Sequence, residues 1–224
     1  MIWMAGFTVI PLLMVFYYGL TDRSGAFTLA NILAIGSSEH LKALWLSLAL
    51  AGVSTVICLL LAYPLALILR KRHIGKGSFV VFIFILPMWM NFLLRTMAWQ
   101  TLLEKNGVIN TFLTMLHLPN IAIINTPAAI ILGMVYNFLP FMVLPIYNTL
   151  AKIDDNVINA ARDLGADNYQ TLTKILLPLS VPGIVSGITM VFVPALTTFV
   201  ISNLLGGSKI LLIGNVIEQE FTKG

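Results

Sequence analysis

The sequence contains few of the residues on which metal binding, redox chemistry and nucleophilic catalysis depend. It has one cysteine, Cys58, and three widely separated histidines, His40, His73 and His117. A single cysteine cannot form an intramolecular disulfide, a cysteine metal cage or a redox pair, and no two histidines have the spacing of metal ligands. Neither a G-x-x-x-x-G-K-[ST] phosphate loop nor a G-x-S-x-G nucleophile motif occurs. We therefore predict no metal, no cofactor, no catalytic residues and no nucleotide hydrolysis within this chain.

Charged residues are also scarce. They make up 10% of the chain, against 58% hydrophobic residues, and the mean hydropathy is +0.94. A soluble domain of 224 residues cannot bury so large an apolar share in one core. The net charge of +4 does not indicate a nucleic-acid partner, because outside residues 70–76 the basic residues are dispersed. The composition predicts an integral membrane protein in contact with lipid.

Long apolar segments make up most of the chain. A membrane span needs about 20 predominantly apolar residues, and its backbone polar groups must be paired within the segment. Continuous helices meet both conditions. The predicted fold class is therefore all-α, a polytopic membrane helical bundle with a polar loop at residues 151–180. The five predicted spans are residues 1–20, 43–69, 78–103, 126–150 and 181–203.

Basic residues are unevenly distributed among the short loops. Arg70, Lys71, Arg72 and Lys76 lie within one short connection. Cytoplasmic loops of membrane proteins are enriched in Lys and Arg. With this connection inside the cell, alternation of the spans puts the N-terminus and the 151–180 loop in the cytoplasm.

The 151–180 loop has the residues of a helical hairpin. Asp154 or Asp155 can cap a first helix that runs to about Leu164. Gly165 suits the left-handed residue that ends a helix, and Asp167 can cap a second one. We expect the second helix to end near residue 176, with Pro178 and Pro182 punctuating the way into the last span. Small apolar residues share one face of the first helix at three- to four-residue steps: Val157, Ala160, Ala161 and Leu164.

The loop also carries a spaced motif. It reads N-A-A-R-D-L-G at residues 159–165 and, after nine further residues, I-L-L-P at residues 175–178. This pattern resembles the cytoplasmic "EAA" loop of ATP-binding-cassette importer permeases, which docks on the ATPase subunit. The usual first residue, glutamate, is Asn159 here, which removes a salt bridge to the ATPase. The resemblance implies the following coupling residues: Asn159, Ala160, Ala161, Asp163, Gly165, Ile175, Leu177 and Pro178.

Other segments between residues 78 and 217 resemble the B-type permease subunits of spermidine/putrescine importers. They include L-P-M-W at 86–89, Y-N-F-L-P-F-M at 136–142 and N-L-L-G-G at 203–207. The resemblance implies a type I importer permease in a prokaryotic cell membrane, with six spans, so we expect a further span beyond Gly224. It also implies three kinds of partner: a second homologous permease, two cytoplasmic ATP-binding subunits and an extracytoplasmic substrate-binding protein. Substrate would pass between the permeases by alternating access.

A few residues within the predicted spans are candidates for the substrate pathway. Arg95 lies about 26 Å along its span at 1.5 Å per residue, where it either snorkels to the interface near Trp99 or lines the outer mouth of the pathway. Aromatic rings can contact a polyamine by cation–π interaction, and they can equally serve packing. The candidate pathway residues are Arg95, Tyr136, Asn137, Phe138, Phe141, Phe192 and Phe199.

Two alternatives to a polyamine importer remain. An importer permease for another small solute, such as an anion, a metal complex or a vitamin, would share the loop and the fold. A secondary transporter would carry its own coupling site, usually an acidic group within a span or broken helices arranged as repeats. The sequence has neither feature in the predicted spans.

Overall fold

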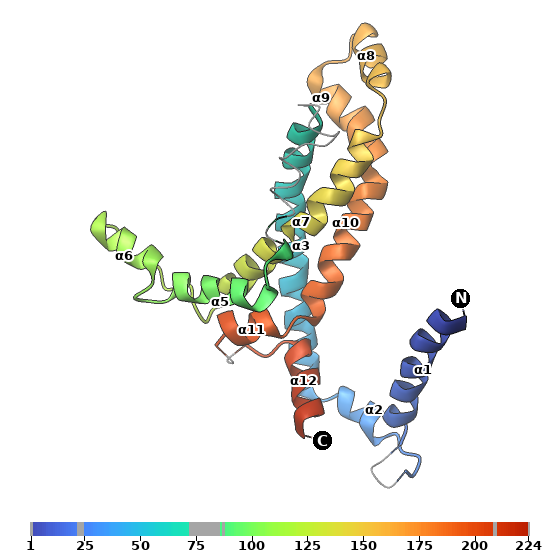
Figure 1. Cartoon of the computed structure of the whole chain (residues 1–224), viewed down its shortest axis with the longest axis vertical. Coiled ribbons are helices and arrows are strands. Elements are labelled where there is room, and N and C mark those ends of the chain that lie inside the picture. The colour runs from blue at the N-terminus through green and yellow to red at the C-terminus, as the bar shows by residue number, and fades with distance from the viewer. Residues whose placement is uncertain (1, 22–24, 72–85, 87, 208–209, 224) are drawn as a thin grey trace. The chain divides into compact units, whose positions relative to one another are not determined.

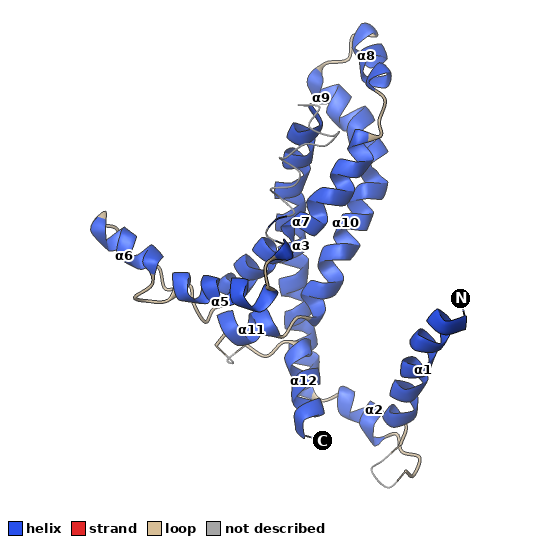
Figure 2. Ribbon diagram, in the orientation of Figure 1, coloured by secondary structure: helices blue, strands red, loops and turns tan. Residues whose placement is uncertain are grey.

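The computed structural model describes residues 2–21, 25–71, 86, 88–207 and 210–223, and these residues are mostly helical (Figure 1). Figure 2 shows helices and loops in this part of the chain, and an isolated bridge pairs Thr21 with Phe27. The prediction of an all-α membrane fold is confirmed. Three of the described helices are long and apolar enough to cross a membrane. The chain divides into two compact units, residues 1–45 and residues 46–224.

The first unit contains two helices and the beginning of a third. Helix α1 (Ile2–Gly19) carries no charged residue and corresponds to the first predicted span. A short turn follows, in which the backbone N–H of Thr28 donates to the carbonyl of Leu20 at 2.8 Å. Helix α2 (Ala30–Ile35) has six residues, and α3 (Ser38–Lys71) then begins and continues into the second unit.

The second unit is built on three long helices, α3, α7 (Pro127–Ala151) and α10 (Leu177–Thr197). The part of α3 in this unit packs against both of the others. The Ser54 hydroxyl donates to Met134 Sδ at 3.4 Å on α7, and the Tyr63 and Ser180 hydroxyls lie 3.1 Å apart, which joins α3 to α10. Small buried residues recur every three or four positions along the contacting face of α3, which lets the helices approach closely: Ser47, Ala51, Ser54, Cys58, Ala62 and Ala66.

Helices α7 and α10 are in backbone contact at two glycines spaced four residues apart. A Cβ atom on Gly183 would lie 2.5 Å from Thr149 Oγ1 and 2.8 Å from the carbonyl oxygen of Pro145. One on Gly187 would lie 2.7 Å from Met142 Sδ. Gly183, the first of the two glycines, lies against Pro145 and Thr149, and Gly187 lies against Met142, which comes earlier in α7. The two helices therefore run antiparallel. A glycine at each end of a four-residue step is a common device for close helix packing in membranes.

The predicted span 78–103 is only partly described, because residues 72–85 and 87 lie outside the described residues. Its end forms α5 (Phe92–Leu103), and the Asn91 side chain caps this helix by accepting from the N–H groups of Leu93 and Leu94. The chain bends at Met90 before the cap. The prediction of one unbroken helix through residue 103 is therefore wrong, since the asparagine starts a new helix. Helix α6 (Val108–Met115) follows α5.

The predicted span 181–203 does not form one continuous helix. Helix α10 begins at Leu177 and ends at Thr197, because Thr198 adopts an extended backbone and a separate helix, α11 (Val200–Leu205), follows. Pro194 weakens this end of α10, since it has no N–H for the carbonyl of Met190. Helix α12 (Ile213–Lys223) returns to the break: the Asn215 side chain donates to Asn203 Oδ1 at 2.7 Å and to the Phe199 carbonyl at 3.3 Å.

The glycine contact between α7 and α10 leads to a stability prediction. Gly183→Ala places a methyl group against Thr149 and the Pro145 carbonyl, so we expect a loss of about 1–3 kcal/mol, typical of overpacking. Gly52→Ala on α3 is the matched control, because nothing lies within 4 Å of a Cβ there. Thermal unfolding of the detergent-purified protein measures both variants. Equal unfolding temperatures for the two would contradict the close contact.

Candidate functional site

The loop between α7 and α10 begins with a short capped helix, α8 (Asp155–Asp163). Of the two aspartates predicted as caps, Asp154 is the cap: its carboxylate accepts from the N–H of Asn156 at 2.9 Å. Asp155 instead forms an ion pair with Arg70 at the end of α3, at 3.0 Å. The Arg70 guanidinium also donates to the carbonyl of Ile153 at 2.9 Å. These two contacts fasten the start of the loop to α3.

Helix α8 ends in the turn predicted at Gly165. The glycine has a φ of +86°, in the left-handed region, as predicted. Its N–H donates to the Arg162 carbonyl at 2.9 Å, and the Ala166 N–H donates to the Ala161 carbonyl at 3.0 Å. This pair of bonds is a Schellman motif, which satisfies the last carbonyls of the helix. The direction of the chain after α8 is therefore fixed by backbone bonds.

The next helix begins at a capping box. The Asp167 carboxylate accepts from the N–H of Gln170 at 2.7 Å, and the Gln170 side chain accepts from the N–H of Asp167 at 3.3 Å. The prediction that Asp167 caps this helix, α9 (Asn168–Thr171), is confirmed. A capping box satisfies two otherwise unpaired donors at once.

The prediction that this second helix ends near Leu176 is wrong. Helix α9 continues through one π-helical segment, η1 (Leu172–Leu176), directly into α10. Pro178 lies in the first turn of α10 and has no N–H to donate to the carbonyl of Lys174. A wider π turn accommodates such a missing bond without ending the helix. Helix α9, η1 and α10 therefore form one continuous helix that leads from the hairpin into the bundle.

Several apolar side chains at the loop point away from the bundle. Leu164 is 90% exposed and Tyr169 is 73% exposed, with Val157 beside them on the same loop. Ile158 is buried and faces the bundle. Exposed apolar groups held on a rigid turn indicate a protein-binding surface. Sequence reasoning identified Val157 and Leu164 and missed Tyr169, although its position inside the capping box fixes it in the first turn of α9.

The other residues of the spaced motif fall into two places. Asn159 lines a cavity under α8, Ala160 and Asp163 are exposed, and Ala161 is half-buried. Three further motif residues lie beyond α9 on the returning helix, and only the first of them is half-buried while the other two are exposed: Ile175, Leu177 and Pro178. The motif residues of α8 and Gly165 therefore lie in the α8–α9 hairpin, whereas the residues of the I-L-L-P segment lie on η1 and α10, which follow it.

The candidate pathway residues do not converge on one site. Arg95 is 7% exposed, with its guanidinium carbon 5.8 Å from the centre of the Tyr136 ring, so its side chain packs against α7 instead of snorkelling outward. The Trp99 ring lies edge-on to Tyr136 at 5.2 Å. Phe138 is buried, and Phe141 is 6.5 Å from it, measured between ring centroids.

The remaining three candidates make no ring contact with this group among the described residues, although Asn137 is its neighbour on α7. Asn137 is buried, and its amide donates to the Gly133 carbonyl at 2.9 Å within α7. Phe192 packs half-buried against the core, and Phe199 is 39% exposed at the break after α10. Among the described residues no ring contact joins either phenylalanine to the other aromatic candidates. Their role in transport stays a prediction.

The fold and the hairpin together define a class of protein. A bundle of long apolar α-helices that carries a capped helical hairpin on a polar loop is an integral membrane protein. Residues 60–220 match the family described as binding-protein-dependent transport system inner membrane component, and the chain belongs to this family. The match includes residues 60–71 at the end of α3, the hairpin and residues 213–220 of α12.

Individual relatives extend the match over almost the whole chain. The chain is 39% identical to the spermidine/putrescine transport system permease protein PotB of Haemophilus influenzae, over 98% of this chain and 79% of that protein. The protein of the same name in Escherichia coli K12 is also 39% identical, over 98% of this chain and 82% of its own length. A PotB homolog of Mycoplasma genitalium is 31% identical over 97% of this chain. These relatives are transport permease subunits by name.

The Schellman turn can be tested by substitution. A Cβ on Gly165 would meet nothing within 4 Å, so Gly165→Val adds only backbone strain, about 1–3 kcal/mol at a left-handed position. We expect amide exchange in the last turn of α8 to accelerate by about 5- to 150-fold, measured by hydrogen–deuterium exchange. Gly165→Asn is the matched control, because asparagine tolerates this conformation. Equal protection in the two variants would contradict the assigned turn.

Proposed function

We propose that this chain is a permease subunit of an ATP-driven importer of polyamines, spermidine or putrescine. The observation that carries the proposal is the 39% identity to spermidine/putrescine permeases over 98% of the chain. The chain holds the membrane pathway, and ATP hydrolysis resides in a partner subunit. Substrate crosses between this chain and a second, homologous permease as the pair alternates between inward and outward openings.

The α8–α9 hairpin is the proposed docking site for the ATPase. Its exposed Val157, Leu164 and Tyr169 supply the apolar contact. The Schellman turn and the capping box hold the hairpin rigid, and the continuous α9, η1 and α10 rod connects it to the bundle. A displacement of the docked hairpin would therefore reach α10 without passing through a flexible joint. Asn159, in place of the usual glutamate, leaves shape and apolar contact as the basis of docking.

The proposed orientation places the hairpin and the N-terminus in the cytoplasm. The cation-rich end of α3, with Arg70 and Lys71, lies at the same end of the second unit as the hairpin, because Arg70 contacts both Ile153 and Asp155. Lys and Arg favour the cytoplasmic side of short loops. The substrate-binding protein would then act on the opposite side, where α11 and α12 lie (Figure 1).

Transport by the reconstituted complex tests the substrate. Proteoliposomes that contain the whole complex, with its binding protein supplied on the outside, should take up labelled spermidine or putrescine when ATP is enclosed with the ATPase. Labelled phosphate, a vitamin and a metal chelate serve as comparison solutes. ATP-dependent uptake of one of these solutes, without polyamine uptake, would assign a different substrate.

Docking through the hairpin predicts a strong effect at Leu164. Leu164→Asp puts a charge where an apolar contact forms, and loss of a central interface anchor costs about 2 kcal/mol, or about 30-fold in ATPase affinity. Leu118→Asp is the matched control, because Leu118 is also an exposed leucine, at 50%, and lies outside the hairpin. Binding of the purified ATPase to each variant in nanodiscs measures the difference. Unchanged affinity in Leu164→Asp would contradict docking at this surface.

The orientation predicts opposite accessibility for two lysines. In a Cys58→Ala background, Lys174→Cys should be labelled by an impermeant thiol reagent only after the cells are opened, whereas Lys105→Cys should be labelled on intact cells. Lys105 lies between α5 and α6, and Lys174 is an exposed residue of η1, so neither is part of the glycine contact between α7 and α10. Labelling of position 174 from outside would reverse the topology and remove the hairpin from the ATPase.

A further inference from the structure

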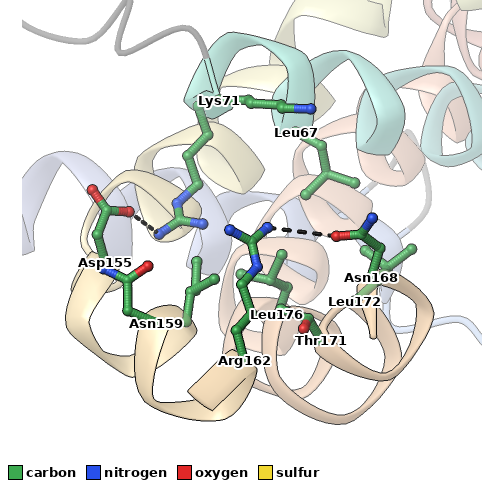
Figure 3. A pocket seen from close by; sticks show the side chains of 11 residues that line it. Leu67, Lys71, Asp155, Asn159, Arg162, Asn168, Thr171, Leu172 and Leu176 are labelled. Carbon is green, nitrogen blue, oxygen red and sulfur yellow. Dashed lines mark hydrogen bonds and ion pairs between the residues drawn. The ribbon is translucent and has the colours of Figure 1, made fainter. Parts of the chain in front are cut away.

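A cavity with a volume of about 640 Å³ lies between the end of α3 and the α8–α9 hairpin. Figure 3 shows the side chains that line it, among them that of Arg162 on α8, and Arg70 at the end of α3 also lines it. Leu164 and Tyr169, the two most exposed apolar residues of the hairpin, do not line the cavity, whereas Asn159, one of the predicted coupling residues, does. Nothing in the proposed transport function requires the cavity.

The cavity has an excess of positive charge. Among the described residues, three cations line it, Arg70, Lys71 and Arg162, against one carboxylate, Asp155. That carboxylate is committed to Arg70 at 3.0 Å. Arg162 has a neutral partner instead: its guanidinium donates to the Asn168 side-chain oxygen at the long distance of 3.5 Å. Arg162 and Lys71 therefore contribute positive charge that no lining carboxylate balances, which favours an anionic ligand.

Three leucines also line the cavity. Leu67 lies one turn before Arg70 on α3, and Leu172 and Leu176 lie on η1 where the hairpin joins the bundle. The order along the helices is therefore cations toward the helix end and leucines toward the long apolar segment. A phospholipid at a membrane surface presents the same order, with a phosphate above acyl chains.

We propose that this cavity binds an anionic phospholipid, with its phosphate between Arg162, Lys71 and Arg70 and the start of its acyl chains against the leucines. Arg and Lys are the side chains that bind phosphate oxygens, and basic pockets between helices at the cytoplasmic side take lipid headgroups. Bound there, the lipid would bridge α3 and the hairpin beside the existing Arg70–Asp155 ion pair. It would thereby hold the hairpin against the bundle in a membrane that contains anionic lipid.

Native mass spectrometry of the whole purified complex tests the site. The complex is delipidated in detergent and titrated with phosphatidylglycerol, and with phosphatidylcholine as the neutral lipid. We expect preferential retention of phosphatidylglycerol, weakened about fivefold by Arg162→Gln and about 25-fold by Arg162→Gln with Lys71→Gln, at about 1 kcal/mol per cation. Lys174→Gln is the matched control, because Lys174 is a cation of the same loop that does not line the cavity. Arg162→Lys should retain most of the binding.

Three outcomes would overturn the proposal. Equal loss of phosphatidylglycerol in Arg162→Gln and Lys174→Gln would mean that the lipid binds the charged surface in general. Saturation of the site by inorganic phosphate alone, at the same affinity as the lipid, would make it a site for a free anion. Loss of the ATPase subunit from the Arg162→Gln complex with lipid retention unchanged would assign these cations to the protein partner.

Discussion

The contact of α10 on α7 at Gly183 and Gly187 is the constraint on which the rest of the second unit depends. In lipid, the hydrophobic effect does not draw apolar helices together, so close packing and satisfied backbone groups must do so. The two glycines allow α10 to meet the backbone of α7, and the small stripe on α3 completes the arrangement. The hairpin connects these two helices, so their separation sets the distance between its two ends. A larger residue at the contact would move the helices apart.

The hairpin is stiff for reasons that are independent of the bundle. Its first helix is capped at Asp154, its turn is closed by the Schellman bonds at Gly165 and Ala166, and its second helix starts in a capping box at Asp167. Each device satisfies backbone donors or acceptors that a loop would otherwise leave to water. The loop can therefore hold apolar side chains outward in solvent, and that surface suits a partner that presses on it and moves it.

The sequence was sufficient to predict the local devices and insufficient for the boundaries of the long helices. The cap at Asp167 and the left-handed Gly165 follow from side-chain chemistry within a few residues, so they were predictable. The continuation of the helix past Leu176 was not, because a π turn next to Pro178 depends on the balance of the surrounding packing. Likewise the end of α10 at Thr197 follows the return of α12, whose Gly214 lies against the Thr197 carbonyl, a contact from a distant part of the chain. The aromatic candidates were chosen by residue type, and residue type does not say which side of a helix faces a neighbour.

The π turn of η1 also sets the rotational position of the hairpin around the axis of α10. Each residue of an α-helix advances the chain by about 100° around the axis, and a π turn accommodates one residue more than an α-helical path of the same rise. The azimuth of the hairpin relative to the α7-facing side of α10 is therefore encoded in the number of residues between Thr171 and Leu177. A deletion of one residue in this interval would leave every side chain of the hairpin intact and aim it in another direction. The direction in which the hairpin points therefore depends more on the length of η1 than on the identity of its residues.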